Sequence, residues 1–347
     1  MNKIESGEKL DFQNVLIRPK RSTINSRSEV SLLRPFTFKY SPKTWFGIPI
    51  IAANMDKTGT FEVYETLSQH KIITAMHKFY STDDYIQYKN THTLDPSLFM
   101  VSTGISDADL EKLHSILEVV DCNWICVDIA NGYIQKLVDF CKNLRSLYPD
   151  KIIVAGNVVT REMVEELILN GYVDVVKAGI GPGSVCTTRI KTGVGMPQLS
   201  AILECADAAH GVGGHLISDG GITCPGDMAK SFGAGADFVM MGGQFAGHDQ
   251  NPGEIVEENG KKYKLFYGMS SEKAQETHYG KMNSYRSSEG RVVKVPYKGD
   301  LNNTVLDYLG GLRSTCTYIN ARNIKQMAKC TTFVRVSQQV NNYFQAS

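Results

Sequence analysis

The residue with the clearest chemical potential is Cys186, which lies in a glycine-rich segment that reads G-I-G-P-G-S-V-C-T-T-R from Gly179 to Arg189. The alternating glycines and the proline predict a sharply bent loop, because glycine adopts backbone angles that other residues avoid. Such a loop can expose a nucleophilic thiol and turn carbonyl oxygens toward a cation. The alternative is a structural turn around a buried cysteine, and composition alone favours neither.

Two further segments combine glycine pairs with polar residues. Ser218 to Gly221 reads S-D-G-G, and Met241 to Gly243 reads M-G-G. Backbone N–H groups of such turns bind phosphate in many barrels, where they follow the last two strands. Asp219 could instead bind a ribose, since a carboxylate accepts hydrogen bonds from both hydroxyls of a diol. The alternative is two ordinary glycine turns.

Other polar residues allow more than one interpretation. The segment Asp128-Ile129-Ala130-Asn131-Gly132 could contact a cofactor or a substrate, or could simply cap a helix. Lys78 and Arg286 are candidates for binding an anionic group, although exposed basic residues are usually only solvated. His77 has no obvious partner in the sequence, so it receives no role.

Short apolar runs must position these residues. The eight runs are Pro49–Asn54, Lys71–Met76, Leu98–Thr103, Asn123–Asp128, Lys151–Gly156, Asp174–Ala178, Gly214–Asp219 and Ala236–Met241. Continuous apolar runs predict strands buried on both faces, as in a parallel sheet. Eight runs alternating with helical patterns indicate a (β/α)8 TIM barrel rather than an open doubly wound sheet, because no G-x-G-x-x-G follows the first run. Active sites of barrels lie where strands end, and Cys186 and both glycine pairs follow runs.

Amphipathic segments between the runs predict helices. Three clear examples are Ser106–Val120, Ile134–Tyr148 and Arg161–Asn170. Ser106 supplies a hydroxyl cap and is followed by acidic residues, which suit the start of a helix. Gly171 stands where a glycine commonly ends one.

The alternation stops after the eighth run. About sixty residues separate that run from a C-terminal helix that begins near Asn302, which is long for a connection. Glu254–Glu258 and Lys261–Tyr267 flank Asn259-Gly260, a strong signal for a hairpin turn. The polar remainder, Ser270–Gly299, predicts a mobile flap over the site. We therefore expect one catalytic barrel domain over residues 1–347, with a flap at about residues 244–301.

Composition excludes several classes of protein. The 37 Lys and Arg residues nearly balance 36 Asp and Glu residues, so the large basic excess of a nucleic-acid-coating protein is absent. The N-terminus has no apolar signal segment, and no apolar stretch is long enough to span a membrane. The eight cysteines contain no C-x-x-C pair, which argues against a zinc site, and disulfides are not expected without a secretion signal.

With these residues assembled, the sequence resembles the IMP dehydrogenase/GMP reductase family over essentially its whole length. The most specific match is G-P-G-S-V-C-T-T-R at 181–189, which continues to T-G-V-G-M-P-Q at 192–198. The other matching segments are L-I-R-P-K-R-S-T at 16–23, I-I-A-A-N-M-D at 50–56, V-D-I-A-N-G-Y at 127–133, L-F-Y-G-M-S-S at 265–271, Y-R-S-S-E-G at 285–290 and L-G-G-L-R-S at 309–314.

The resemblance implies a reductase that converts GMP to IMP and ammonia with NADPH. It places the nucleophile at Cys186, whose thiolate adds to purine C2 as ammonia leaves and is released when hydride reaches C2. Such covalent catalysis divides one difficult substitution into two easier steps. Ammonia leaves readily only when protonated, and Thr188 and Glu289 match the family's proton-handling pair.

The resemblance also assigns binding residues. The nucleotide is expected to contact Ser184, Asp219, Gly220, Gly221, Gly242, Gly243, Gly268, Met269, Ser270, Arg286, Ser287, Ser288 and Gly290. NADPH is expected to contact Ser26, Arg27, Lys78, Asp128, Ile129, Ala130, Ile180, Gly181, Met269, Tyr285, Arg286, Ser314, Thr315, Cys316 and Thr317. A potassium ion is expected at Gly181, Gly183, Cys186 and Arg189. Members are typically homotetramers, in which Ser26-Arg27 could reach a neighbouring subunit's cofactor, and a cytoplasmic location is expected.

The family's dehydrogenase branch is the main alternative. Only about twenty residues separate His77 from the third run, which leaves no room for the regulatory domain pair usually inserted there. The dehydrogenases hydrolyse their intermediate with an Arg-Tyr pair in the flap, whereas this chain has Tyr285-Arg286 and no Arg-Tyr dipeptide. A non-catalytic nucleotide-binding regulator is a second alternative, against which the presence of Cys186, Thr188 and Glu289 argues.

Overall fold

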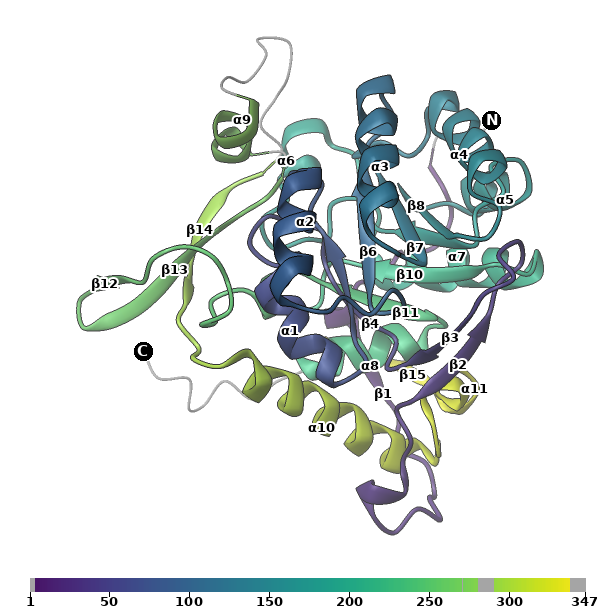
Figure 1. Ribbon diagram of the computed structural model, residues 1–347. Helices are drawn as coiled ribbons and strands as arrows, with labels where there is room; N and C mark the ends of the chain where they lie inside the picture. Colours follow the sequence, from purple (N-terminus) through teal and green to yellow (C-terminus); the bar gives the residue numbers. More distant parts are fainter. Residues whose placement is uncertain (1–3, 270, 280–289, 338–347) are drawn as a thin grey trace.

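The computed structural model describes residues 4–269, 271–279 and 290–337 of the 347-residue chain. Eight parallel strands close into a barrel in the order β10-β11-β4-β5-β6-β7-β8-β9, which confirms the predicted TIM barrel (Figure 1). The barrel strands are β4 (Ile50–Ala52), β5 (Ile73–Met76), β6 (Phe99–Thr103), β7 (Trp124–Asp128), β8 (Ile152–Val158), β9 (Val175–Ala178), β10 (His215–Asp219) and β11 (Phe238–Met241). All eight apolar runs therefore became barrel strands.

The barrel strands are buried on both faces, as their continuous apolar composition requires. Every residue of β4, β5, β6, β9 and β11 is buried. One face of each strand fills the barrel interior and the other packs against the helices. Lys177 in β9 is the exception in chemical type, because it is a charged residue in an otherwise apolar strand and is only 1% exposed.

Helices surround the barrel. They are α1 (Phe61–Gln69), α2 (Thr82–Thr91), α3 (Asp107–Val119), α4 (Gln135–Leu147), α5 (Arg161–Leu169), α6 (Thr188–Thr192), α7 (Gln198–Gly211), α8 (Pro225–Gly233), α9 (Glu272–Tyr279), α10 (Leu301–Ile319) and α11 (Met327–Cys330). Short 3-10 turns are η1 (Phe12–Asn14), η2 (Arg27–Glu29), η3 (Gly243–Phe245) and η4 (Ile324–Gln326). Ser106 caps α3 through a reciprocal box with Asp109, as its hydroxyl predicted.

The end of α5 differs from the expected glycine cap. Asn170 is the C-cap residue, and the left-handed conformation falls on Tyr172, with φ of 56°, rather than on Gly171. Gly171 is needed for a different reason: a Cβ there would lie 2.7 Å from the carbonyl oxygen of Leu167. The glycine thus permits a close approach of the chain to its own helix.

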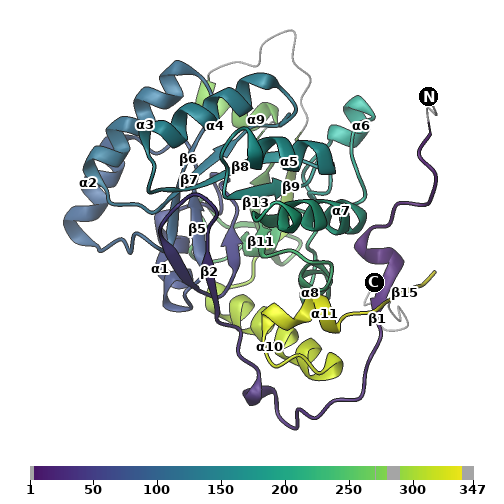
Figure 2. The same ribbon diagram turned by 90° about the vertical axis from the view of Figure 1, so that its right-hand side faces the viewer.

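A hairpin of β2 (Arg34–Thr37) and β3 (Thr44–Gly47) covers one end of the barrel. The Phe36 ring stacks on Phe238 with centroids 4.4 Å apart, and Trp45 packs edge-on against Trp124. A second small sheet pairs β1 (Val15–Ile17) with β15 (Phe333–Arg335), which joins the two ends of the described chain (Figure 2). Short runs with mixed composition gave no sequence signal for either sheet.

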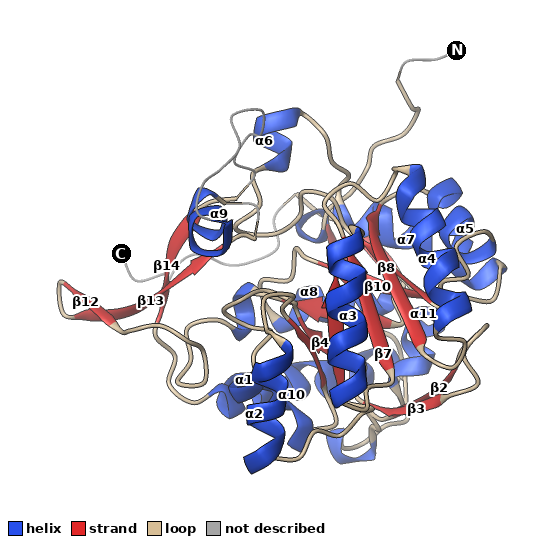
Figure 3. Cartoon of the chain, turned by 45° about the horizontal axis from the view of Figure 1, so that its top comes forward, coloured by secondary structure: helices blue, strands red, loops and turns tan. Residues whose placement is uncertain are grey.

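The flap is more regular than the sequence predicted. Its hairpin of β12 (Val256–Glu258) and β13 (Lys261–Tyr267) turns at Asn259-Gly260, both with positive φ, as predicted. The expected polar flap, however, also contains helix α9 and β14 (Val292–Pro296), which pairs antiparallel with β13 over five residues. The result is a three-stranded sheet beside the barrel (Figure 3).

All eight cysteines are free thiols. Five are buried, namely Cys122, Cys126, Cys141, Cys205 and Cys316. Cys186 and Cys330 are half-buried, and Cys224 is exposed. None of the helices in the described part of the chain is long and apolar enough to cross a membrane.

A buried carboxylate ties the covering hairpin to the barrel. Asp237, which precedes β11, is paired with Arg34 at 2.7 Å, accepts from the N–H of Leu216 at 3.0 Å and lies 2.7 Å from Nε2 of His210. Burial disfavours its charge, but hydrogen bonds with His210 and His215 prevail and hold the pKa of Asp237 well below its usual value. The same contact with Asp237 raises the pKa of His210.

We expect Asp237→Asn to lower the free energy of unfolding by about 3 kcal/mol, because it leaves the Arg34 guanidinium unpaired. The stabilisation from the Asp237 carboxylate is present above its unfolded pKa of about 3.9. The stabilisation from charged His210 is present below its unfolded pKa of about 6.5 and is lost as pH rises through its raised folded pKa. The difference in free energy of unfolding between wild type and Asp237→Asn, measured by urea unfolding, should therefore be largest between these two pH values. Asp121→Asn, which removes an exposed partner of Lys151, should cost less than about 0.5 kcal/mol. Equal effects of the two substitutions would show that Asp237 stabilises the fold no more than a surface charge does.

Candidate active site

The loop after β9 places Cys186 at the barrel mouth and leads into α6. The Cys186 N–H donates to the Gly183 carbonyl at 3.1 Å, which closes a tight turn around the cysteine. The Cys186 thiol lies 3.2 Å from the Thr188 hydroxyl, measured from Sγ to Oγ1. The half-buried thiol therefore has an immediate oxygen partner, and the buried-cysteine alternative does not hold for Cys186.

Two glycines of this loop, Gly179 and Gly181, lie where a side chain would meet close neighbours. Gly181 has φ of +86°, and a Cβ there would lie 2.6 Å from Cγ of Arg189. A Cβ on Gly179 would lie 2.1 Å from the carbonyl oxygen of Asp219. Gly220, with φ of +91°, approaches Pro182 in the same way. The thiol-bearing loop and the turn after β10 therefore interlock backbone to backbone.

The glycine turn after β11 lies against the same loop. A Cβ on Gly243 would lie 3.1 Å from Oγ of Ser184, and one on Gly242 would lie 3.0 Å from Sδ of Met55. The two predicted glycine pairs and Ser184 thus meet around the thiol. Backbone N–H groups of glycine turns and a serine hydroxyl are neutral donors that suit an anionic group.

The described ends of the flap dock onto the cysteine loop. Arg291 donates to the Ser184 carbonyl from Nη2 at 2.8 Å, and its N–H donates to the Val185 carbonyl at 3.0 Å. Gly290 forms isolated bridges with Cys186 and with Ser271. Gly268 passes so close to Gly290 that a Cβ there would be 3.2 Å from its Cα.

A second contact holds the flap to the end of β4. Tyr267 donates to Oδ2 of the buried Asp56 at 2.7 Å, and Nε2 of His278 lies 2.9 Å from the same oxygen. The His278 ring stacks on Phe79 with centroids 3.5 Å apart. Burial lowers the pKa of the neighbouring His77 to about 4, so this histidine is neutral at pH 7. Lys57 lies over the Tyr267 ring, 5.6 Å from its centroid.

The site also contains a buried lysine, Lys177, to which the sequence analysis gave no role. Its ammonium lies 3.0 Å from Oδ1 of Asp128 and 3.2 Å from Oδ2 of Asp219. Asn54 donates to the other oxygen of Asp128 at 2.8 Å, and Asn157 donates to Asp219 at 2.8 Å. The signal that could have identified it is the single charge inside the apolar run V-V-K-A.

The residues expected to bind the cofactor fall into two groups. The first lies at the barrel mouth near Cys186 and comprises Lys78, Asp128, Ile129, Ala130, Ile180, Gly181 and Met269. The second lies where η2, with Ser26 and Arg27, packs against α10, which carries Ser314, Thr315, Cys316 and Thr317. Figures 1 and 2 show α10 on the side of the molecule away from α6. Cys316 is fully buried, so its side chain is closed to a ligand.

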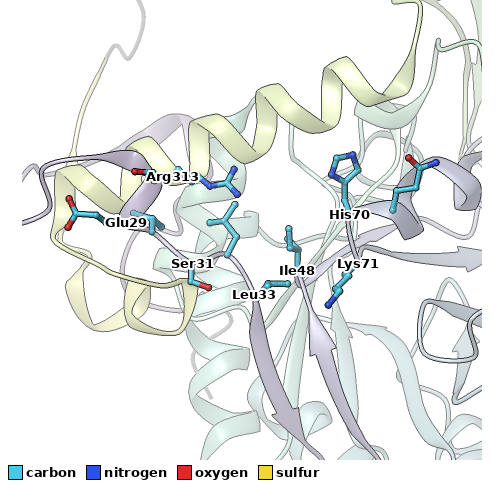
Figure 4. Close-up of a pocket in the computed structure, with 11 residues that line it drawn as sticks. Glu29, Ser31, Leu33, Ile48, His70, Lys71 and Arg313 are labelled. Carbon is cyan, nitrogen blue, oxygen red and sulfur yellow. The ribbon is translucent and has the colours of Figure 1, made fainter.

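A surface pocket adjoins the second group. Arg313, His70 and Lys71 line it together with Glu29, Ser31, Leu33 and Ile48 (Figure 4). The pocket lies beside α10, which Figure 1 shows on the opposite side of the barrel from α6, the helix that follows Cys186.

Some expected site residues lie outside the described residues. These are Ser270, Tyr285, Arg286, Ser287, Ser288 and Glu289. Among the residues that the structure describes, no cluster of three or more His, Cys, Asp or Glu side chains could hold a metal ion. The backbone carbonyls of Gly181, Gly183 and Cys186 are hard oxygen donors of a different kind, and Asp11 pairs with Arg189 at 3.4 Å beside them.

The sequence of the chain matches known proteins along nearly its full length. A family model described as "IMP dehydrogenase / GMP reductase domain" matches residues 9–342. GMP reductase 1 of Mus musculus is 58% identical over 345 residues, which covers 99% of this chain and 100% of the relative. GMP reductase of Caenorhabditis elegans is 55% identical, with 99% and 96% covered, and GMP reductase of Salmonella typhi is 57% identical, with 99% of each covered.

The exposure of the thiols makes a direct prediction. Burial raises the pKa of Cys122, Cys126 and Cys141 to about 12, so these thiols carry almost no thiolate at pH 7.5. We expect iodoacetamide to label Cys186 and Cys224 at least about tenfold faster than these three in the native protein. Peptide mass spectrometry over time measures the rates, and urea-unfolded protein is the control in which all should react alike. Labelling of Cys126 as fast as Cys186 in native protein would contradict the placement of Cys186 at the barrel mouth.

Proposed function

Since this chain belongs to the IMP dehydrogenase/GMP reductase family, we propose that it reduces GMP to IMP and ammonia with NADPH, in purine nucleotide interconversion. The chain is an oxidoreductase, as are its relatives over their full length. The observation that carries the proposal is the half-buried Cys186 thiol, 3.2 Å from the Thr188 hydroxyl and surrounded by glycine turns that can receive a nucleotide. The catalytic domain comprises residues 1–347, with the flap as part of it.

Cys186 is the proposed nucleophile. Its thiolate adds to C2 of the purine, and departure of the C2 amino group as ammonia leaves a thioimidate between Cys186 and the nucleotide. NADPH, when bound, supplies the hydride that reduces C2. The carbon–sulfur bond then breaks and the bonding electrons return to Cys186. The close packing of Gly179 and Gly181 against their neighbours supports a fixed position of Sγ through both steps.

Thr188 and Glu289 are the proposed proton carriers. Ammonia must be protonated to leave, and a hydroxyl beside the sulfur can pass a proton that a carboxylic acid supplies. Thr188 has the required position. Glu289 immediately precedes Gly290, whose bridge to Cys186 supports a location of the carboxyl near the thiol when the flap is closed.

The nucleotide is proposed to bind across the three interlocked loops. Its phosphate would meet the N–H groups of Gly221, Gly242 and Gly243 and the Ser184 hydroxyl, and Asp219 would accept from the ribose hydroxyls. The base would lie beside Gly268, Met269 and Ser270, under residues 286–290. This arrangement places an anionic ligand on backbone donors rather than on a basic field, in keeping with the formal net charge of +1.

The cofactor and the cation fit this chain in different ways. Lys78, Asp128, Ile129, Ala130, Ile180 and Gly181 would hold the reactive end of NADPH near Cys186. Ser26, Arg27 and Ser314 to Thr317 lie too far from that end, so we propose that a neighbouring copy of the chain provides them, within a homotetramer in the cytoplasm. Carbonyl oxygens of Gly181, Gly183 and Cys186, with Arg189 at the edge, would hold potassium and order the thiol loop.

The direct test is oxidation of NADPH by purified protein in the presence of GMP, followed by loss of absorbance of the reduced nicotinamide. Cys186→Ala should lower the rate by at least about 10⁴-fold, because the covalent route is lost, and leave the dissociation constant of GMP within about threefold. Cys224→Ala is the matched control and should retain full activity. Reduction of NAD by the protein with IMP, and no reaction with GMP, would instead indicate the dehydrogenase, and neither reaction would indicate a nucleotide-binding regulator.

The proton role of Glu289 has its own test. Glu289→Gln should slow release of ammonia by about 10²–10⁴-fold, since the amide cannot supply the proton, with little change in affinity for GMP. Rapid-quench measurement of ammonia separates this step from hydride transfer. A wild-type rate of ammonia release in the variant would remove Glu289 from the proton path.

A further inference from the structure

Four neighbouring strands place a chain of alternating charges at the mouth of the barrel. Asp128 ends β7, Lys177 lies in β9 and Asp219 ends β10. In the barrel, β8 lies between β7 and β9, and β9 pairs directly with β10. In the register of the sheet, Asp128 and Lys177 both pair with Gly156 of β8. A Cβ on Gly156 would lie 2.6 Å from Cβ of Lys177, so the glycine leaves space for the lysine side chain to pass.

The ammonium of Lys177 cannot reach a ligand itself. Its side chain is 1% exposed and lies between the two carboxylates, at 3.0 Å from Asp128 and 3.2 Å from Asp219. The carboxylates are more open, with side-chain exposures of 32% and 20%. Oδ2 of Asp219 accepts from both Lys177 and Asn157, and among the described residues none donates to its Oδ1. The lysine is therefore behind the carboxylates, and the carboxylates face the mouth.

We propose that Lys177 is a positioning residue whose ammonium, placed between them, holds the nucleotide-binding carboxylate, Asp219, and the cofactor-binding carboxylate, Asp128, at a fixed separation. This inference rests on the proposed function, which assigns the two aspartates to different ligands. The distance between purine C2 and the hydride donor depends on both carboxylates, so one buried ammonium sets the alignment of two ligands. Residues outside the contact shell of a ligand typically change activity about 10–100-fold when their orienting contacts are lost.

The charges around the lysine support this role. Burial disfavours the charged form of Lys177, but Asp128 and Asp219 outweigh burial and raise its pKa. Burial also opposes ionisation of Asp128, and the charge of Lys177 with the hydrogen bond from Asn54 lowers its pKa nevertheless. Lys78 adds a more distant positive charge on the Asp128 side, and Cys126, whose pKa burial raises to about 12, is neutral. Lys177 thus supplies the positive charge that lies between the two carboxylates.

The test compares Lys177→Met with wild-type protein through ligand affinity as well as turnover. Without the ammonium, the two carboxylates retain a shared proton at higher pH, since like charges disfavour joint ionisation. Calorimetry with GMP and with NADP+ at pH 8 and pH 6 gives dissociation constants for both proteins. At each pH, the variant's dissociation constant is divided by that of the wild type. Titration of the ligand's phosphates affects both proteins equally and therefore cancels in this affinity ratio. We expect this ratio to rise about fivefold or more on going to pH 6 for at least one ligand, and kcat to fall about 10–100-fold.

Two further variants separate positioning from a purely structural role. Lys177→Met/Asp128→Asn has one carboxylate and no ammonium, so the pH dependence of the affinity ratio for GMP should disappear. Lys177→Arg keeps the charge and should keep the wild-type pH dependence. Lys230 is also a buried lysine, and it donates to the Phe12 carbonyl at 2.9 Å. Lys230→Met is therefore the matched control, and its affinity ratio should be the same at both pH values. Lys177→Gln takes the place of Lys177→Met, with the same expected result, should the methionine variant not fold.

The outcomes are distinct. A folded Lys177→Met protein whose affinity ratios for both ligands do not change with pH would overturn the inference, as would a double variant that keeps the pH dependence of the single one. Wild-type protein that binds neither GMP nor NADP+ would overturn the proposed function itself. Binding by wild type with a constant ratio in the variant would leave the proposed function intact and reject only the role of Lys177.

Discussion

The close approach of three backbone loops at the barrel mouth is the constraint on which the rest of the site depends. Gly179, Gly181 and Gly220 each lie where a Cβ would meet a neighbouring atom at 3.0 Å or less. With no side chains between them, the loops after β9 and β10 interlock, and the Cys186 thiol is held at a single place beside Thr188. Preorganisation of this kind matters for a covalent mechanism, because the sulfur must be aligned with C2 when the carbon–sulfur bond forms and again when it breaks.

Charge inside the barrel is arranged by the same architecture. Residues from alternate strands share a layer of the barrel interior, which brings Lys177 of β9 level with Asp128 of β7. The ammonium pairs with two carboxylates that lie at the mouth. Asn54 donates to the second oxygen of Asp128, and Asn157 donates to the same oxygen of Asp219 that Lys177 contacts. The flap covers the arrangement from outside, through Arg291 and through the contacts of Tyr267 and His278 with Asp56, so an apolar shell, a charged layer and the flap meet at one end of the barrel.

Periodicity and spacing predicted the barrel strands, since eight short apolar runs that alternate with helical patterns are typical of a (β/α)8 barrel. They could not predict the β2–β3 cover or β14, because short edge strands of mixed composition acquire their structure from the surfaces they meet. Cys186 and the glycine pairs were recognisable from local sequence. Lys177 was not, because its partners Asp128 and Asp219 lie 49 and 42 positions away in the chain and only the register of the barrel joins them.

The proposed mechanism requires a covalent bond between Cys186 and the purine during the reaction. Incubation with IMP and NADP+ in the absence of ammonia should run the hydride step in reverse and stop at the thioimidate. Acid quenching followed by peptide mass spectrometry then reads the adduct. We expect one nucleotide on the peptide that contains Cys186, dependent on NADP+. Formation of NADPH without such an adduct, or an adduct on another cysteine, would contradict the covalent mechanism.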